Sequence, residues 1–481
     1  MSFKVIGNML GKLLMYFSTL MIFPLLAAYH YHEIIAVIAF IWSIIITFLT
    51  GLFLQVLCSF KNSIGNKESY LIATLGWVFV SGFSTLPFLF SKTIPDFLNA
   101  YFERMSGYTA TGATILTDIE SNPLSILLWR NEIQWIGGMG IILLVVALLP
   151  LLGVSGMRLV KSEFPGFELD KIKPRILETA RTIWLIYIFI TLAEIICLYL
   201  FGMPLFDAII NTFGTVPTGG FNLKNNSIAY YNNVIFEIII MIFMFISAVN
   251  FSLHYRFFRG DRKVYYKDQE FLFFISIILI SILLVTLQLR FSIYDSIHNA
   301  LRYASFQVVS IVTTTGFINA DYGNWPHFSQ LILVLLMFLG GCVGSTAGAI
   351  KSVRMLLMFK QLKQSFDKLL HPHAIVQVRL GGKVISDDIM QSIKSFFLIY
   401  IFVFIAGVMI ITATGLDITS AIGAVAATLG GVGPGLGLVG PTQNYAFTSS
   451  IGKITLIICM LLGRLEIYTV IVLLVPEFWK K

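Results

Sequence analysis

The sequence predicts an all-α, multi-pass membrane protein, and three observations support this fold class. Of the 481 residues, 57% are hydrophobic and 12% are charged, whereas a soluble globular domain carries about 25% charged residues. Many windows of roughly 20 predominantly apolar residues are long enough to cross a bilayer core about 30 Å thick. In addition, a polar stretch that ends in a glycine cluster recurs four times between these windows. The chain lacks the polar surface of a soluble protein, so we expect it to be embedded in a membrane.

The apolar windows predict the membrane spans in order. The first window, residues 13–29, follows Lys4 and Lys12 and superficially resembles a secretory signal. The pair Ala27-Ala28 is a poor cleavage site, so we expect an uncleaved first span. Later windows have their cores at residues 141–152, 183–200, 235–249, 271–289, 331–339, 396–412 and 454–475.

The cations predict the orientation of the chain, whose net charge is +8. Of the 33 Lys and Arg residues, 19 lie in three polar segments, residues 153–181, 254–267 and 351–394. The positive-inside rule assigns such segments to the cytoplasm. Lys4 and Lys12 near one end of the chain, and Lys480 and Lys481 near the other, place both termini on the same side. The positive charge therefore indicates membrane orientation rather than nucleic-acid binding.

One unit recurs four times between the cationic segments. Each copy begins at an aspartate, continues for one to five helical turns and ends in a Thr/Gly or Val/Gly cluster, with apolar spans before and after it. The four copies open at Asp96, Asp207, Asp295 and Asp417. If Gly112, Gly220, Gly316 and Gly433 are equivalent positions, the intervals between them are 108, 96 and 117 residues. A period near 100 residues predicts four copies of one supersecondary unit.

The unit has the order span, short half-helix, extended glycine segment, span. Each copy enters from one cytoplasmic segment and leaves to the next, so the glycine segments all face outward. The repeats are then parallel and surround an axis along the membrane normal. The predicted repeats are residues 69–160, 161–262, 263–370 and 371–481, after a two-helix N-terminal addition of residues 1–68.

The residue types of the unit predict cation binding. An aspartate at a helix start can cap free N–H groups and complement the positive end of the helix dipole. The negative ends of four such helices, converging on one axis, favour a cation. Glycine permits the φ values that turn successive carbonyl oxygens towards one line, and rings of carbonyls replace the hydration shell of K⁺ in potassium channels. The predicted ion-binding residues of this selectivity filter are Thr111, Gly112, Gly219, Gly220, Thr315, Gly316, Val432 and Gly433.

Close helix packing is the alternative explanation of the glycines. A single cluster could serve that purpose, as GxxxG does in membrane helices. Four clusters in matching context favour the filter.

The four clusters also carry a resemblance to a known family. YTATGAT, VPTGGF, VTTTGF and GGVGPGLG, in this order and spacing, resemble the Trk/Ktr/HKT superfamily of cation transporters, over nearly the whole chain. The resemblance implies a potassium-channel-like pore of four M1–P–M2 repeats plus two extra N-terminal transmembrane helices, with K⁺ as the substrate ion. It also implies a homodimer in the bacterial inner membrane, with one pore per subunit, and a cytosolic nucleotide-binding regulatory subunit resembling TrkA.

Two departures from the superfamily pattern affect the filter. Members usually carry asparagines where this chain has Gly430 and Gly431, which leaves the fourth filter position open between Gly433 and Gly435. In the first repeat Ala113 takes the place of a phenylalanine, so the ring cannot be symmetric.

The resemblance further implies a gate beneath the filter. The segment GGCVGSTAGAIKSVR, residues 340–354, interrupts the second span of the third repeat where the superfamily has an intramembrane loop. The predicted gate residues are Gly340, Gly341, Gly344, Ser345, Thr346, Gly348 and Arg464. Such a glycine-rich segment cannot form a firm apolar helix, although a flexible helix end before Lys351 at the cytoplasmic surface is an alternative.

Arg464 lies inside the apolar window 454–475. A charge near the middle of a span costs at least ~2.5–3.5 kcal/mol, so Arg464 should face the pore or a partner. A simple ion pair with Glu466 is the alternative, but residues two apart on a helix do not share a face. We expect Arg464 to brace the gate loop and to repel cations while the pore is closed.

Other classes of function have little support in the sequence. The four cysteines are scattered singly, and neither an HExxH motif nor a P-loop or dinucleotide-binding glycine pattern occurs. We therefore expect no enzymatic activity and no bound cofactor. The alternative function is a secondary transporter coupled to H⁺ or Na⁺ (a symport), for which inverted repeats and charged residues at the site would be typical.

Overall fold

The computed structural model describes residues 2–58, 65–140, 173–374 and 376–480. Within these residues, six helices are long and apolar enough to cross a membrane, or up to eight if two sharply bent pairs count as spans. The predicted span at 141–152 and most of the cationic segment 153–181 lie outside the described residues. Large apolar side chains such as Phe402 (73% exposed) cover the outer surface of the helices, as expected for contact with lipid.

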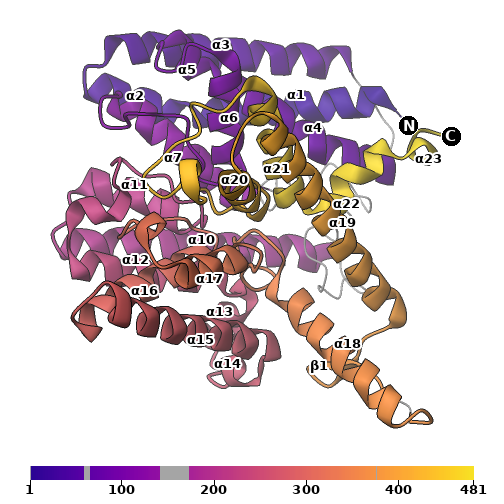
Figure 1. Cartoon of the computed structure of the whole chain (residues 1–481). Coiled ribbons are helices and arrows are strands. Elements are labelled where there is room, and N and C mark those ends of the chain that lie inside the picture. Colours follow the sequence, from indigo (N-terminus) through magenta and orange to yellow (C-terminus); the bar gives the residue numbers. More distant parts are fainter. Residues whose placement is uncertain (1, 59–64, 141–172, 375, 481) are drawn as a thin grey trace.

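Three helices precede the repeats: α1 (Phe3–Leu20), α2 (Ile22–His30) and α3 (Ile34–Leu57). The first two form one apolar stretch of 28 residues, which contains the predicted first span, residues 13–29. Val5 and Ile6 of α1 share an apolar cluster with Phe478 near the other end of the chain. The two termini therefore lie together, as Figure 1 shows.

The M1–P–M2 unit then occurs four times, as the sequence predicted. The long M1 helices are α4 (Asn66–Ser84), α10 (Lys173–Leu200), α15 (Gln269–Ser292) and α19 (Asp387–Ala413). The short P helices are α6 (Phe97–Tyr108), α11 (Leu205–Thr215), α16 (Ile297–Val312) and α20 (Ile418–Gly430). The M2 helices are α7 (Leu124–Gly138), α12 (Val234–Ala248), α17 (His327–Met337) and α21 (Ser450–Arg464). The boundaries between the repeats remain predictions.

Short elements connect these helices. They are α5 (Leu86–Phe90), η2 (Ser227–Tyr231), α13 (Phe251–Phe258), α14 (Val264–Lys267), η3 (Tyr322–Asn324), η4 (Gly437–Val439), α22 (Glu466–Ile471), η5 (Val472–Leu474) and α23 (Pro476–Trp479). A longer helix, α18 (Ser352–Leu370), leads into a small antiparallel hairpin of β1 (Arg379–Leu380) and β2 (Lys383–Val384). Figure 1 shows α18, the hairpin and the start of α19 projecting from the helical body.

The M2 helices are shorter than the sequence suggested. The window 454–475 was predicted as one span, and this is wrong: α21 and the helix after it meet at an angle of 110°. The break coincides with Glu466, whose φ of +52° is incompatible with a continuous right-handed helix. In the second repeat, α12 and α13 likewise meet at 99°.

The predicted aspartate caps are present on two of the four P helices. The carboxylates of Asp96 and Asp417 accept hydrogen bonds from the backbone N–H groups of Asn99 and Ser420. The prediction is wrong for the other two helices. Asp207 lies within the first turn of α11 and accepts from the Tyr231 hydroxyl, whereas Ser296, one residue after Asp295, caps α16. A serine hydroxyl serves equally well at this position.

The apolar core has two large clusters that meet at the P helices. One cluster unites the N-terminal helices with most of the first and fourth repeats, and the other unites the second and third repeats. Ile210 of α11 belongs to the first cluster and Ala427 of α20 to the second. The P helix of the second repeat thus packs against the first and fourth repeats, and the P helix of the fourth repeat packs against the second and third. This packing holds the glycine segments that follow the P helices.

Candidate ion-binding filter and gate

The four glycine segments share one backbone conformation. Gly112, Gly220, Gly316 and Gly433 have φ values of +83°, +79°, +78° and +96°. Two residues before each of them lies another residue with positive φ: Ala110 (+53°), Thr218 (+55°), Thr314 (+59°) and Gly431 (+71°). In this φ pattern Gly433, and not Gly435, is equivalent to the other three glycines.

The same hydrogen bond fixes each segment to its P helix. The N–H of the residue before the filter glycine donates to the carbonyl five residues earlier. The pairs are Thr111 to Ser106 (2.8 Å), Gly219 to Gly214 (2.9 Å), Thr315 to Ser310 (2.9 Å) and Val432 to Ala427 (2.8 Å). This is the bond of a Schellman helix end, and it directs all four chains away from the helix C-termini in the same way.

The four segments close into a ring. A Cβ added to a filter glycine would collide with the carbonyl oxygen of the residue before the next repeat's glycine. The distances are 2.1 Å from Gly112 to Gly219, 2.0 Å from Gly220 to Thr315, 1.9 Å from Gly316 to Val432 and 2.6 Å from Gly433 back to Thr111. Only glycine can occupy these positions, and the order of contacts around the ring follows the order of repeats in the sequence.

A pocket lies on one side of the ring. All four filter glycines line it, together with the residues that follow them, such as Thr114, Asn222, Ile318 and Pro434. Residues of four repeats, more than 300 positions apart in the sequence, therefore share one centre.

The ring contains carbonyl oxygens that the protein leaves open. Among the described residues, no hydrogen-bond donor contacts the carbonyl oxygens of Thr111, Thr315 or Val432, although all three residues are buried. A buried carbonyl normally has a partner. The carbonyl oxygens of two other filter residues do have partners. That of Gly219 accepts from the Gln134 amide (2.7 Å), and that of Gly433 accepts from the Tyr445 hydroxyl (2.8 Å). Each of these keeps a second lone pair, and the ring is asymmetric, as expected.

The threonine hydroxyls support the loops from behind. Thr109 donates to the carbonyl of Met105 and pairs with the Thr111 hydroxyl at 2.7 Å. The third repeat has the same arrangement, since Thr313 donates to Val309 and pairs with Thr315 at 2.9 Å. These side chains brace the backbone that presents the carbonyls.

Polar side chains of α7 hold the second glycine segment, a role that the sequence analysis missed. The Gln134 amide donates to the Gly219 carbonyl, and its oxygen accepts from the Phe221 N–H at 2.8 Å, so Gln134 spans Gly220. Asn131 donates to the Phe221 carbonyl at 2.7 Å. The available signal was the run RNEIQ inside an otherwise apolar helix, because polar side chains within spans are costly and mark functional positions.

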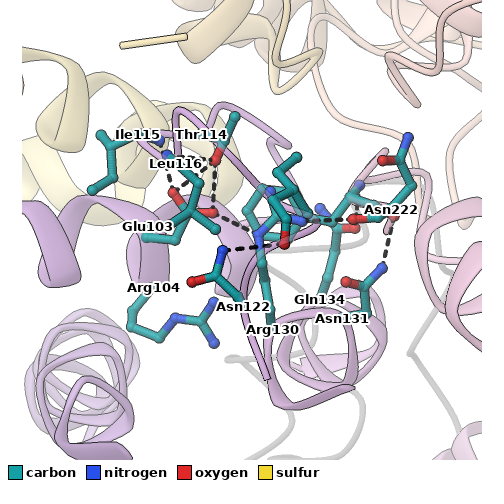
Figure 2. Close-up of polar contacts among 12 residues, drawn as sticks. Glu103, Arg104, Thr114, Ile115, Leu116, Asn122, Arg130, Asn131, Gln134 and Asn222 are labelled. Atoms are coloured by element: carbon teal, nitrogen blue, oxygen red, sulfur yellow. Dashed lines mark hydrogen bonds and ion pairs between the residues drawn. The ribbon is translucent and has the colours of Figure 1, made fainter. Parts of the chain in front are cut away.

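A buried ion pair lies within the first repeat and contacts the second. Glu103 accepts from Arg130 Nε at 2.7 Å, and both side chains are almost fully buried. Glu103 also accepts from Thr114 and the Ile115 N–H, while Arg130 reaches the Asn222 carbonyl at 3.1 Å. Figure 2 shows Arg130 between these partners. Glu103 is therefore a buried structural residue next to the glycine segment of the first repeat.

An equivalent network supports the third segment. Glu237 of α12 accepts from Arg302 at 2.6 Å and from the Asn319 amide at 2.9 Å. Gln307 in turn donates to the Asn319 side chain at 3.0 Å. In each of the two networks, a glutamate–arginine pair helps to hold a chain segment that follows a filter glycine.

The acidic residues near the pocket lined by the filter glycines act mainly as local supports. Asp118 accepts from the Glu120 and Ser121 N–H groups and from Asn225, and Glu120 pairs with Lys224 at 3.1 Å. The hydrogen bond from Asn225 lowers the pKa of the Asp118 carboxyl, so this side chain is charged at neutral pH.

The predicted gate segment is a buried, non-helical loop. It separates α17 from α18, and the Gly340 N–H donates to the Ile350 carbonyl at 2.8 Å, which closes its base. Gly340, Gly341, Gly344, Thr346 and most of their neighbours are buried, while Ser345 and Gly348 are partly buried. The alternative of a flexible helix end at the surface does not describe this geometry.

The loop contacts the residues that precede the filter glycines. The Gly348 N–H donates to the Thr314 hydroxyl at 2.8 Å, and Thr218 donates to the Thr346 hydroxyl at 3.3 Å. Since the pocket on one side of the ring is lined by residues that follow the glycines, the loop lies on the opposite side of the ring.

Arg464 joins the loop to the first repeat. Its guanidinium donates to the Thr346 carbonyl at 2.9 Å and to the Gly137 and Gly138 carbonyls at 2.7 and 2.9 Å. Glu466 instead accepts from Arg354, so the predicted alternative of an Arg464–Glu466 pair is not what the structure has. A second pocket between the loop and α21 is lined by Gly344, Thr346, Gly348 and Arg464. The side chain thus lies at the loop, on the side of the ring opposite the pocket lined by the filter glycines.

Four parallel repeats that close one ring of glycine segments define a pore-forming membrane transport protein. Residues 36–481 match the family model described as TrkH, cation transport protein. The chain belongs to the TrkH family.

Several relatives are similar over their full lengths. The Trk system potassium uptake proteins TrkH of Salmonella typhimurium and of Escherichia coli K12 are 42% and 40% identical to the chain, with 100% of each chain covered. The crystal structure of the potassium transporter TrkH from Vibrio parahaemolyticus matches with a TM-score of 0.90 at 36% identity and covers 100% of both chains.

Proposed function

We propose that the chain takes up K⁺ across the bacterial inner membrane as the pore-forming subunit of a Trk system. The observation that carries this proposal is the closed ring, in which each filter glycine lies against the carbonyl of the next repeat. The open carbonyls of Thr111, Thr315 and Val432 supply oxygen ligands without formal charge, which suit a monovalent cation released from water. The names of the relatives, which are potassium uptake proteins, support K⁺ as that ion.

The filter ligands of the proposal are the backbone oxygens of the eight predicted residues, Thr111, Gly112, Gly219, Gly220, Thr315, Gly316, Val432 and Gly433. Four P helices end one turn before them, and the negative ends of the helix dipoles favour a cation there. The protein contributes position and electrostatics only, with no bound cofactor.

The gate of the proposal is the loop between α17 and α18. It is held by Arg464 through the Thr346 carbonyl, and its removal from the axis would free the path below the filter. A guanidinium at this place also opposes the passage of cations until it moves. Opening requires that the bonds of Arg464 to the Gly137 and Gly138 carbonyls exchange for others.

The assembly of the proposal is a homodimer with cytoplasmic termini, regulated by a cytosolic nucleotide-binding subunit resembling TrkA. The names of the relatives refer to a Trk system, which supports partners of this kind. The projecting elements α18, β1 and β2 carry Lys360, Lys363, Lys368, Arg379 and Lys383 and suit a cytosolic contact.

The test is flux in vesicles of the purified chain. Radioactive rubidium uptake should be driven by an outward K⁺ gradient and be competed by K⁺ more strongly than by Na⁺. Equal competition by both ions would overturn the proposed selectivity.

Coupling to H⁺ is the second candidate, and one observation favours it. Glu132 of α7 and Glu194 of α10 are buried carboxylates, each with at least one oxygen that no described residue hydrogen-bonds. Unpaired carboxylates within membrane spans often mark proton pathways. Rubidium uptake that requires an imposed proton gradient, and loses that requirement in Glu132→Gln and Glu194→Gln, would establish the coupled function.

A further inference from the structure

An apolar groove opens on the side of the molecule formed by the second and third repeats. It has a volume of about 420 Å³ and is lined by side chains of α10, α12, α13, α14 and α15, among them Phe189, Ala193, Phe243, Phe258 and Phe271. An apolar cavity of about 150 Å³ is enough to bind benzene. The groove therefore has room for a segment of hydrocarbon chain.

The bend of the second M2 segment creates the groove. Because α13 turns by 99° from α12, the two helices line the groove from different directions, together with α10. The polar groups within the groove are already satisfied, since His254 pairs with the Tyr265 hydroxyl at 2.8 Å and with the Ile246 carbonyl at 2.9 Å. The occupant must be apolar where it contacts these walls.

A cationic segment borders the groove at one end. It runs through α13, the following turn and α14, and its exposed cations are Arg256, Arg259, Arg262, Lys263 and Lys267. Two carboxylates oppose them: Asp261 pairs with Arg256 at 2.7 Å, and Asp268 caps α15. The segment keeps an excess of three positive charges, and the charge distribution predicts that it faces the cytoplasm. Basic segments of this kind at a membrane surface attract anionic lipid headgroups.

We propose that the groove is a binding site for one anionic phospholipid of the cytoplasmic leaflet. One acyl chain lies between the aromatic side chains of α10, α12 and α13, and the phosphodiester lies on Arg259, Arg262 and Lys263. The groove suits an acyl chain and the cations suit a phosphate, and an anionic phospholipid carries both. A free anion lacks the acyl chain, and a neutral lipid lacks the net negative charge.

The walls of the groove are bonded to the loop beneath the filter. The Ala248 carbonyl at the end of α12 accepts from the Cys342 N–H at 2.8 Å, and the Phe251 N–H donates to the Gly344 carbonyl at 3.1 Å. Glu270, next to Phe271 of the groove, accepts from the Val343 N–H at 2.8 Å. If that loop gates as proposed, an effect of the lipid on flux rests on the proposed function, whereas the binding site itself does not.

The test is photocrosslinking of the full chain in phosphatidylcholine vesicles that contain a trace of phosphatidylglycerol with a diazirine in its acyl chain. We expect labelled peptides to concentrate in residues 189–193 and 243–258, and excess unlabelled phosphatidylglycerol to reduce this labelling about tenfold while extra phosphatidylcholine does not. Labelling spread evenly over the lipid-facing helices, or competed equally by both lipids, would overturn the site.

Two variants sharpen the test. Ala193→Phe fills the groove and should lower the labelling severalfold, whereas Ala406→Phe, at a similarly half-buried position on α19, should leave it unchanged. The pair Arg262→Gln and Lys263→Gln should remove the preference for phosphatidylglycerol. Wild-type labelling in Ala193→Phe contradicts the proposal. None of these readouts uses ion transport, so a failure here is distinct from a failure of K⁺ uptake.

Discussion

Replacement of Gly316 by alanine tests the closed ring most sharply. The added Cβ would lie 1.9 Å from the Val432 carbonyl oxygen and 2.8 Å from Pro434 Cδ. Real Cβ contacts are essentially never shorter than 3.0 Å, so the two segments must separate by at least 1.1 Å (3.0 minus 1.9 Å). Ligand distances in metal sites are held within about 0.2 Å, and functional groups within about 0.5 Å. The displaced Val432 carbonyl can no longer coordinate together with its neighbours.

The assay is rubidium uptake into vesicles with equal amounts of folded protein. We expect the rate to fall at least about tenfold, which corresponds to about 1.4 kcal/mol, and the preference of K⁺ over Na⁺ to weaken. The control is Gly202→Ala, because Gly202 has a φ of +98° but no heavy atom within 4 Å of the added Cβ. It carries the same backbone strain, about 1–2 kcal/mol, without the collision. Gly316→Ala vesicles that transport and select like Gly202→Ala vesicles would refute the ring.

Three further predictions follow from the contacts around the filter. Gln134→Leu removes both bonds to the second segment and should lower the K⁺/Na⁺ permeability ratio severalfold; an unchanged ratio would show that the Gly219 carbonyl needs no support. Arg464→Ala should raise leak flux in the absence of any partner. Arg464→Lys should raise it to a smaller extent, because an ammonium does not span all three carbonyls. Closed-state flux equal to wild type in both variants would contradict the bracing role of Arg464. Glu103→Gln leaves the Arg130 charge buried and unpaired and should cost about 3–5 kcal/mol, seen as a lower thermal midpoint in detergent; an unchanged midpoint would contradict the pair.

The sequence predicted the repeated features well because they depend on backbone constraints. The filter glycines could be found because a residue with a Cβ collides with the next repeat at each of these positions, so the spacing is visible in the sequence. The filter position of the fourth repeat could not be predicted from the sequence. Gly431, Gly433 and Gly435 are the same residue type, and only the φ pattern of the folded chain distinguishes them.

Features that depend on tertiary contacts could not be predicted. The break after α21 coincides with the positive φ of Glu466, which a window of hydropathy does not record. The role of Gln134 depends on a segment 85 residues away. Asp207 and Asp295 occur where a cap is expected, but the residue at the N-cap position is Pro204 in α11 and Ser296 in α16.

The core of the proposed function is one monovalent cation that peptide oxygens of different repeats bind at their common centre. Its most direct test is a structure determined with Rb⁺ or Tl⁺ in place of K⁺, using anomalous scattering to locate the ion. We expect a peak on the axis of the ring, within coordination distance of the carbonyls of Thr111, Thr315 and Val432, that disappears when Na⁺ alone is present. Strong ion peaks elsewhere in the spans, with none between these three carbonyls, would contradict it.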